Sequence, residues 1–347
     1  MKRVFAKIYA WALLLLLVGS ACWMALAAWE DLNNLIGAII AFAASLLVAP
    51  CVHELGHVVF ACANEMQIVY CKCFCFRFYA KGGKKKFGFA SPLAADETQV
   101  LPMGSENMEK RAYAYSVGGV VFGGVFVALL TVLLVAFPSF YVLGLLPYSA
   151  YLFLLNVLPA EYSSGRTDTL VAYGIKTGEP VEQTMLNLMR IHGGLQEGKS
   201  FAELPQEWYF SAPQIAEDEP LYVAILDARY SYYVECEEYE KAFDCLKRIQ
   251  AAGEYLSGTE IYTLERNLAY LCLVGGNDAV LKEAVKNGEE YWKGDDYAIK
   301  RTLALYMQKC GETERADLLL AQAQELLQKE QIAGLKKHEE ILLSRIK

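Results

Sequence analysis

The stretch CVHELGHVVF, residues 51–60, places His53, Glu54 and His57 inside an apolar run that is long enough to cross a membrane. Ionisable side chains are costly in hydrocarbon, so those found there usually serve a function. Two histidines four positions apart lie on one face of an α-helix, about one turn apart. That spacing lets two ring nitrogens bind one Zn²⁺, and the adjacent glutamate is placed to take a proton from water at the metal. The stretch therefore predicts two zinc ligands and a catalytic base on one helix.

The same three residues also fit a polar cluster satisfied between helices, or a proton relay of the kind found in transporters. A third ligand distinguishes the zinc site, because catalytic zinc has three protein ligands and one open position. The polar loop NVLPAEYSSGRTD, residues 156–168, offers Glu161 and Asp168 after the last apolar run. The remaining histidines, His192 and His338, lie far along the chain and are expected to be core or surface residues.

The composition predicts a membrane protein, since hydrophobic residues make up 55% of the 347 residues and occur in blocks. Each block approaches or exceeds the length of about 20 residues that a spanning helix needs. The blocks are Phe5–Ala28, Leu35–Ala63, Tyr113–Phe137 and Phe140–Leu158. The first also resembles a secretory signal, but its apolar core is longer than a usual signal sequence, so an uncleaved helix is expected.

The orientation is predicted from basic residues, which concentrate on the cytosolic side of membrane proteins. The segment between the second and third blocks contains many of them, whereas the short segments after the first and third blocks contain none. They are Lys72, Arg77, Lys81, Lys84, Lys85, Lys86, Lys110 and Arg111. We therefore expect an integral protein of a bacterial plasma membrane, with both termini and the histidine pair on the cytosolic side of the lipid bilayer.

The segment between the second and third blocks is expected to contain a β-hairpin. Residues 68–90 alternate around Gly82-Gly83, a pattern typical of two strands joined by a turn. Cysteines at alternate positions share one strand face and are expected to pack there rather than to bind metal. They are Cys71, Cys73 and Cys75, together with Val69. The basic run Lys84–Lys86 is placed to contact anionic lipid headgroups.

The part of the chain after about Gly178 is predicted to be helical, soluble and acidic. The chain after Ala160 contains 21 basic and 32 acidic residues, and this net negative charge argues against a nucleic-acid surface. Similar segments around Ala242, Val280 and Ala316 suggest tetratricopeptide-like helix pairs, with a plain helical bundle as the alternative. Either fold would serve to contact a cytosolic protein partner. The ten cysteines of the chain show no disulfide framework or zinc-finger spacing, which fits a reducing cytosol.

The third block contains glycines that permit close helix packing in lipid. Gly119 and Gly123 form a face of small residues, and Gly118 and Gly124 widen it. This face is expected to bring the fourth block close to the second.

The order of these motifs resembles the site-2 protease family of membrane-embedded zinc metalloproteases. The motif HELGH is followed two blocks later by Asn-x-x-Pro at Asn156 and then by Asp168. The family commonly has Asp-Gly soon after the proline, where this chain has Ser164. A longer version of the motif, which ends in (Ser/Thr)-Asp after a glycine, matches GRTD at Gly165 to Asp168, with Thr169 in place of the glycine that commonly follows the aspartate. Asp168 is therefore the expected ligand, and Glu161 is the alternative.

The resemblance implies a fold and a set of residue roles. It implies a membrane-embedded metalloprotease core, in residues 35–177, with an extra helix before it in residues 1–34. The helical pattern of residues 178–347 predicts a separate cytosolic helical domain there. His53, His57 and Asp168 would bind Zn²⁺, Glu54 would be the catalytic base, and Asn156 would hold substrate backbone or the oxyanion. The expected fold is mainly α: a polytopic membrane protein with about four transmembrane helices, a small cytosolic β-hairpin and an all-α soluble C-terminal domain.

The resemblance also implies a reaction, the hydrolysis of a peptide bond in or near the transmembrane segment of a membrane protein or peptide precursor, as in regulated intramembrane proteolysis. A strand edge near the site would pair with the unwound substrate. The alternative is an inactive membrane scaffold that recruits partners through its helical tail.

Overall fold

The computed structural model describes residues 2–81, 84–91, 94, 96–162, 165–275, 292 and 294–346. The predicted turn at Gly82-Gly83, Ser164 of the closely spaced motif and Val280 of the predicted repeat lie outside these residues. The chain divides into two compact units. The first contains Met1–Leu101 and Asn107–Glu182, and the second contains Pro102–Glu106 and Gln183–Lys347.

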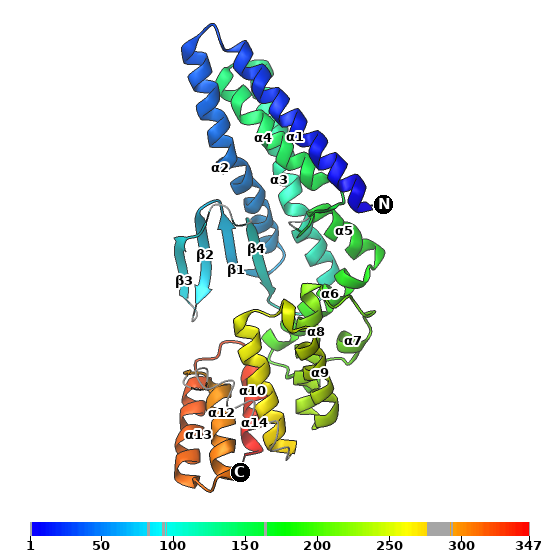
Figure 1. The fold of residues 1–347 in the computed structure, drawn as a ribbon, viewed down its shortest axis with the longest axis vertical. Helices are drawn as coiled ribbons and strands as arrows, with labels where there is room; N and C mark the ends of the chain where they lie inside the picture. The colour runs from blue at the N-terminus through cyan, green and yellow to red at the C-terminus, as the bar shows by residue number, and fades with distance from the viewer. Residues whose placement is uncertain are drawn as a thin grey trace. The chain divides into compact units, whose positions relative to one another are not determined.

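Among the described residues, four helices are long and apolar enough to cross a membrane, as the sequence predicts (Figure 1). All four belong to the first unit, where α4 packs on the other three and α2 also packs on α3. They are α1 (Lys2–Ala27), α2 (Leu32–Ala63), α3 (Met108–Ala136) and α4 (Phe140–Val157). Side chains cap the starts of α2 and α4, where Asp31 and Ser139 accept hydrogen bonds from backbone amides of the first turn.

Glycines set the closest approaches between these helices. The α2 and α3 backbones meet at Gly56 and Gly118, and a Cβ added at Gly118 would lie 2.7 Å from the Gly56 carbonyl oxygen. Gly144 makes the corresponding approach of α4 to α2, with a hypothetical Cβ 2.6 Å from an α2 carbonyl. Gly123, predicted to contribute, has only ordinary contacts with Phe153 at 3.7 Å. Small residues therefore bring α3 and α4 onto α2, at Gly118 of the predicted glycine-rich segment and at Gly56 and Gly144, which were not predicted.

The first unit also contains an antiparallel sheet, larger than the predicted hairpin. Its strand order is β3-β2-β1-β4, and β1 packs on α2 (Figure 1). The strands are β1 (Met66–Cys73), β2 (Phe76–Lys81), β3 (Lys84–Phe89) and β4 (Glu97–Pro102). The predicted first strand is broken at Phe74, whose φ is +54°. Asp96 stabilises this turn, because its Oδ1 accepts hydrogen bonds from the Phe74 amide at 2.7 Å and from Lys72 Nζ at 2.8 Å.

A disulfide joins Cys51 of α2 to Cys73 of β1. The cysteines were expected to fit a reducing cytosol, where disulfides are rare, and this bond does not fit that expectation. No local pattern marks the pair, because the two cysteines are 22 residues apart and are brought together only when β1 packs on α2.

Helices are the main regular element in the described part of the second unit. Consecutive helices pack on one another, most extensively α8 on α9 and α12 on α13. Ala242 of α9 and Ala316 of α13, two of the three alanine or valine positions in the predicted repeat, are fully buried. The tetratricopeptide-like assignment stays a prediction. After α5 (Asp168–Thr177), the described helices are α6 (Pro180–Gln196), α7 (Glu207–Phe210), α8 (Pro220–Glu235), α9 (Tyr239–Ala251), α10 (Gly258–Gly275), α12 (Tyr297–Lys309), α13 (Thr313–Leu327) and α14 (Ala333–Ser344).

Candidate metal centre

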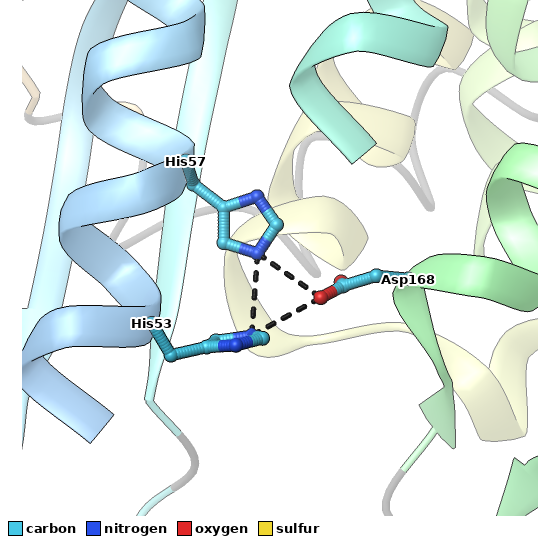
Figure 2. Close-up of side chains that lie close together, drawn as sticks. All are labelled: His53, His57 and Asp168. Atoms are coloured by element: carbon cyan, nitrogen blue, oxygen red, sulfur yellow. Dashed lines mark hydrogen bonds and ion pairs between the residues drawn. The ribbon is translucent and has the colours of Figure 1, made fainter. Parts of the chain in front are cut away.

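Three predicted ligands converge in the first unit. His53 and His57 lie one turn apart on α2, and Asp168 is the first residue of α5 (Asp168–Thr177). Asp168 Oδ2 is 3.1 Å from His53 Nε2 and 3.3 Å from His57 Nε2, and the two Nε2 atoms are 3.4 Å apart. Figure 2 shows the three side chains pointing toward one another across the gap between the helices. The arrangement is a group of three metal-ligating residues that are buried or half-buried.

A short hairpin after α4 brings Asp168 to this position. It consists of β5 (Glu161–Tyr162) and β6 (Gly165–Arg166), which pair antiparallel. Thr167 then caps α5, since its Oγ1 accepts a hydrogen bond from the Leu170 amide. The same hydroxyl donates to the Leu158 carbonyl oxygen at 2.8 Å, which ties the start of α5 to the end of α4.

Glu161, the alternative third ligand, is not part of the converging group found in the described part of the chain. It lies in β5, where its register partner is Arg166 of β6. The structure therefore favours Asp168 as the carboxylate that faces the histidines.

Asn156 is near the end of α4, and its side-chain amide donates to the Leu152 carbonyl oxygen of the same helix at 3.2 Å. Its backbone carbonyl accepts a hydrogen bond from Thr169 Oγ1 at 2.7 Å. Thr169, which stands where the resembling family commonly has glycine, thus anchors α5 to α4. A role for the Asn156 side chain at an oxyanion stays a prediction.

The hydrogen bond of His57 fixes the state of its ring. Its Nδ1 lies 2.9 Å from the Tyr115 carbonyl oxygen, which only accepts hydrogen bonds, so Nδ1 carries the proton. In the neutral ring, Nε2 then presents a lone pair to the cluster. A metal-binding histidine is typically held in this way, with its second nitrogen donating to a carbonyl or carboxylate.

Asp168 Oδ2 is buried and has no hydrogen-bond donor within the described structure. Lone pairs of this oxygen and of His57 Nε2 therefore face one another, an arrangement that is repulsive unless a cation or an added proton lies between them. Two imidazoles and one carboxylate form a donor set that suits Zn²⁺ and other divalent transition metals. The residues present fit a metal ion.

Gly119 borders this cluster. A Cβ at this position would lie 2.5 Å from His57 Nε2 and 2.7 Å from His53 Nε2. Gly119 was expected to serve helix packing alone, but the absence of a side chain there also leaves room for the imidazoles. Its position in a glycine-rich segment was the available signal.

Sequence reasoning missed two residues near Glu54: Thr98, which hydrogen-bonds to it, and Tyr115, which hydrogen-bonds to Thr98. The Glu54 side chain is buried, and Thr98 Oγ1 of β4 donates to its Oε2 at 2.6 Å. The Tyr115 hydroxyl in turn donates to the Thr98 carbonyl oxygen. Tyr115 therefore contacts both the histidine and the strand residue that positions the glutamate. No sequence motif marks Thr98 or Tyr115, because their roles depend on β4 and α3 lying beside α2.

Comparison with protein-family models, with curated proteins and with solved structures finds no match to this chain.

Proposed function

We propose that the chain is an intramembrane zinc endopeptidase of the site-2 protease type. The observation that carries the proposal is the convergence of His53 Nε2, His57 Nε2 and Asp168 Oδ2 without a donor for the carboxylate oxygen. The neighbouring Glu54 supports it, because a buried carboxylate one residue from a zinc ligand is the base that metal-assisted peptide hydrolysis requires.

The proposed chemistry assigns one task to each group. When bound, Zn²⁺ polarises the scissile carbonyl and makes water acidic enough to attack near neutral pH. Glu54 accepts the proton as the water oxygen bonds to the carbonyl carbon, and it passes that proton to the leaving amine as the C–N bond breaks. Thr98 holds Oε2 of Glu54, which leaves Oε1 to take the proton.

The four apolar helices are proposed to span the membrane with the metal centre near the cytosolic face. The basic residues after α2 support this orientation. The Cys51–Cys73 disulfide supports the opposite one, because disulfides persist in oxidising compartments. Cys310 of the second unit is exposed and reports which side is correct. Labelling by a membrane-impermeant maleimide only after cells are permeabilised would support a cytosolic second unit, and labelling in intact cells would contradict it.

The variant Glu54→Gln tests proteolysis directly. The change removes the base and keeps the side-chain volume, so we expect Zn²⁺ content to stay unchanged and cleavage to fall roughly 10²–10⁴-fold. Membrane proteomics should then detect a small single-span protein or peptide precursor that accumulates uncleaved. Glu109→Gln, at an exposed position in the first turn of α3, is the matched control. If processing and phenotype survive Glu54→Gln unchanged, hydrolysis is not the function and a scaffold role replaces it.

A further inference from the structure

A cavity of about 370 Å³ lies in the first unit beside the proposed catalytic base. Its walls come from α2 on one side and from the sheet on the other, and the Glu54 carboxylate side chain is one of its lining groups. The apolar lining includes Leu55 and Val58 of α2, Ile68 of β1 and Phe78 of β2.

The cavity and the metal cluster lie on adjacent faces of α2. Residues three or four positions apart share a helix face, so Leu55 and Val58 line the cavity together with Cys51 and Glu54. His53 and His57 lie on the next face and point to Asp168. Glu54 is thus the boundary between the two. A base must lie within about 2.6–3.2 Å of the group whose proton it takes, so the water that Glu54 deprotonates lies next to this cavity. The peptide bond that this water attacks then lies next to the cavity as well.

The lining selects for apolar groups. Burial raises the pKa of the Cys71 thiol, a further lining group, more than the hydrogen bond from Thr98 lowers it, so this side chain is uncharged near neutral pH. The one lining lysine, Lys85, is exposed. An apolar group that enters the cavity gains contacts with aliphatic and aromatic carbon and leaves few polar atoms without water.

The size of the cavity restricts what enters it. Ligand pockets in proteins range over about 300–1,000 Å³, so this one is at the small end. An α-helix with its side chains is about 10–12 Å across, which is too wide for such a cavity. A single large side chain that projects from an extended peptide fits it.

We propose that this cavity receives a large apolar side chain, such as that of phenylalanine, leucine or methionine, next to the peptide bond that is cleaved. The inference rests on the proposed proteolytic function and adds the substrate class. The substrate is a peptide segment, unwound at the site, that carries such a residue beside the scissile bond. Its side chain anchors the segment while the carbonyl lies at the metal centre.

Two compounds test the cavity without knowledge of the natural substrate. Succinyl hydroxamate binds zinc through its hydroxamate group, and a benzyl-substituted form adds one aromatic side group. Calorimetry with the zinc-loaded full-length protein in lipid nanodiscs measures the affinity of both compounds. We expect the benzyl group to increase affinity about 10–100-fold, the range that apolar pocket contacts supply.

Variants that fill the cavity should remove the higher affinity of the benzyl-substituted compound. Val58→Phe narrows it from the α2 side, and Ile68→Trp narrows it from β1. Val59→Phe is the matched control, because Val59 is 42% exposed and does not line the cavity. The advantage of the benzyl compound should disappear in both filling variants and persist in the control. Persistence of the advantage in both filling variants overturns the inference.

A peptide library with one randomised position, analysed by mass spectrometry, extends the test to cleavage. The wild type should prefer phenylalanine, leucine or methionine over alanine beside the scissile bond by about 10–100-fold, and Val58→Phe should reverse this order. Equal affinity of the two hydroxamates for the wild type overturns the pocket and leaves the metal site standing. If neither compound binds the zinc-loaded wild type, the proposed function fails and this inference fails with it.

Discussion

In the described part of the chain, each unit contains a cluster of imidazole and carboxylate groups that is buried or half-buried, and the two clusters differ in how their hydrogen bonds are completed. In the second unit, Glu235 accepts hydrogen bonds from the backbone amides of Phe201 at 3.1 Å and Ala202 at 2.8 Å, and its side chain contacts His338 Nδ1. Each carboxylate oxygen there has a donor. In the first unit, Asp168 Oδ2 faces two imidazole nitrogens and has no donor.

This difference shows that residue type alone does not identify a metal site. Both clusters pair a carboxylate with histidine, and both are at least half-buried. A buried polar group that is fully hydrogen-bonded stabilises the fold, whereas one left without partners calls for a specific explanation. Glu235 and His338 are therefore interpreted as a pair that stabilises the fold, as expected for a lone histidine far from the HELGH motif. The group of His53, His57 and Asp168 reads as a ligand set.

The strongest test of the comparison replaces one histidine in each cluster. We expect His57→Ala to abolish both Zn²⁺ binding and cleavage, because a two-ligand remnant does not hold the ion in a catalytic geometry. His338→Ala should leave the metal content of the purified protein at the wild-type value. Elemental analysis of both variants at equal protein concentration measures the zinc bound per chain. Loss of metal in His338→Ala, or full metal in His57→Ala, would remove the distinction between the clusters.

The second test concerns the third ligand. Asp168→Ala should weaken Zn²⁺ binding by more than the factor of about 10–100 that loss of an outer hydrogen-bond partner costs. Glu161→Ala should have little effect on affinity, since Glu161 lies outside the converging group. Competition with a zinc-binding dye gives both dissociation constants. Full zinc occupancy in Asp168→Ala together with its loss in Glu161→Ala would transfer the ligand role to Glu161.

These positions also show which features of the fold and the site can be predicted from the sequence. The four apolar helices were predictable because each is a long uninterrupted apolar run, and the contact between His53 and His57 follows from a spacing of one helical turn. Asp168 was chosen because a motif resembles that of a known family. Its distance to the histidines depends on the β5–β6 hairpin, which returns the chain after α4.

Other features depend on contacts between distant segments, and no local pattern encodes them. Thr98 reaches Glu54 across 44 residues of sequence, and Cys51 reaches Cys73 across 22. The break between β1 and β2 at Phe74 depends on Asp96, which lies 22 residues further along the chain. Each of these requires the packing of the sheet on α2 before it can be recognised.

The third test asks whether the Glu235 cluster acts only on stability. Glu235→Ala leaves two backbone amides and His338 without their acceptor, and removing one partner of a buried pair costs about 3–5 kcal/mol. We expect faster hydrogen exchange in peptides covering residues 201–235, measured by mass spectrometry on the full chain, with zinc content unchanged. A variant with normal exchange but altered zinc content would contradict the structural assignment.

The same pair should make the second unit sensitive to acid. Burial raises the pKa of Glu235, but His338 and the Ala202 amide more than offset this and hold the pKa below its usual value. The unfolded chain has a glutamate pKa of about 4.3. A carboxyl whose pKa is lower when folded contributes stability above that value, and the contribution is lost as pH falls through the folded pKa. The protection factors of amides in residues 201–235, which are the intrinsic exchange rates divided by the observed rates at the same pH, should therefore fall below about pH 4 in the wild type, whereas Glu235→Ala should show no such step.

The smallest expected effect comes from Thr98. Its hydroxyl donates a hydrogen bond to the Glu54 carboxylate of the first unit, as the backbone amides of Phe201 and Ala202 do to Glu235 of the second. Thr98→Val keeps the shape of the side chain and removes the hydroxyl that holds Glu54 Oε2. Loss of such a supporting contact typically costs about 10–100-fold in activity, so we expect kcat to fall by that factor while KM and Zn²⁺ content stay unchanged. Thr98→Ser should restore much of the rate, because it keeps the hydroxyl. A variant that loses metal, or that serine fails to rescue, would show that Thr98 supports the fold around α2 and does not position the base.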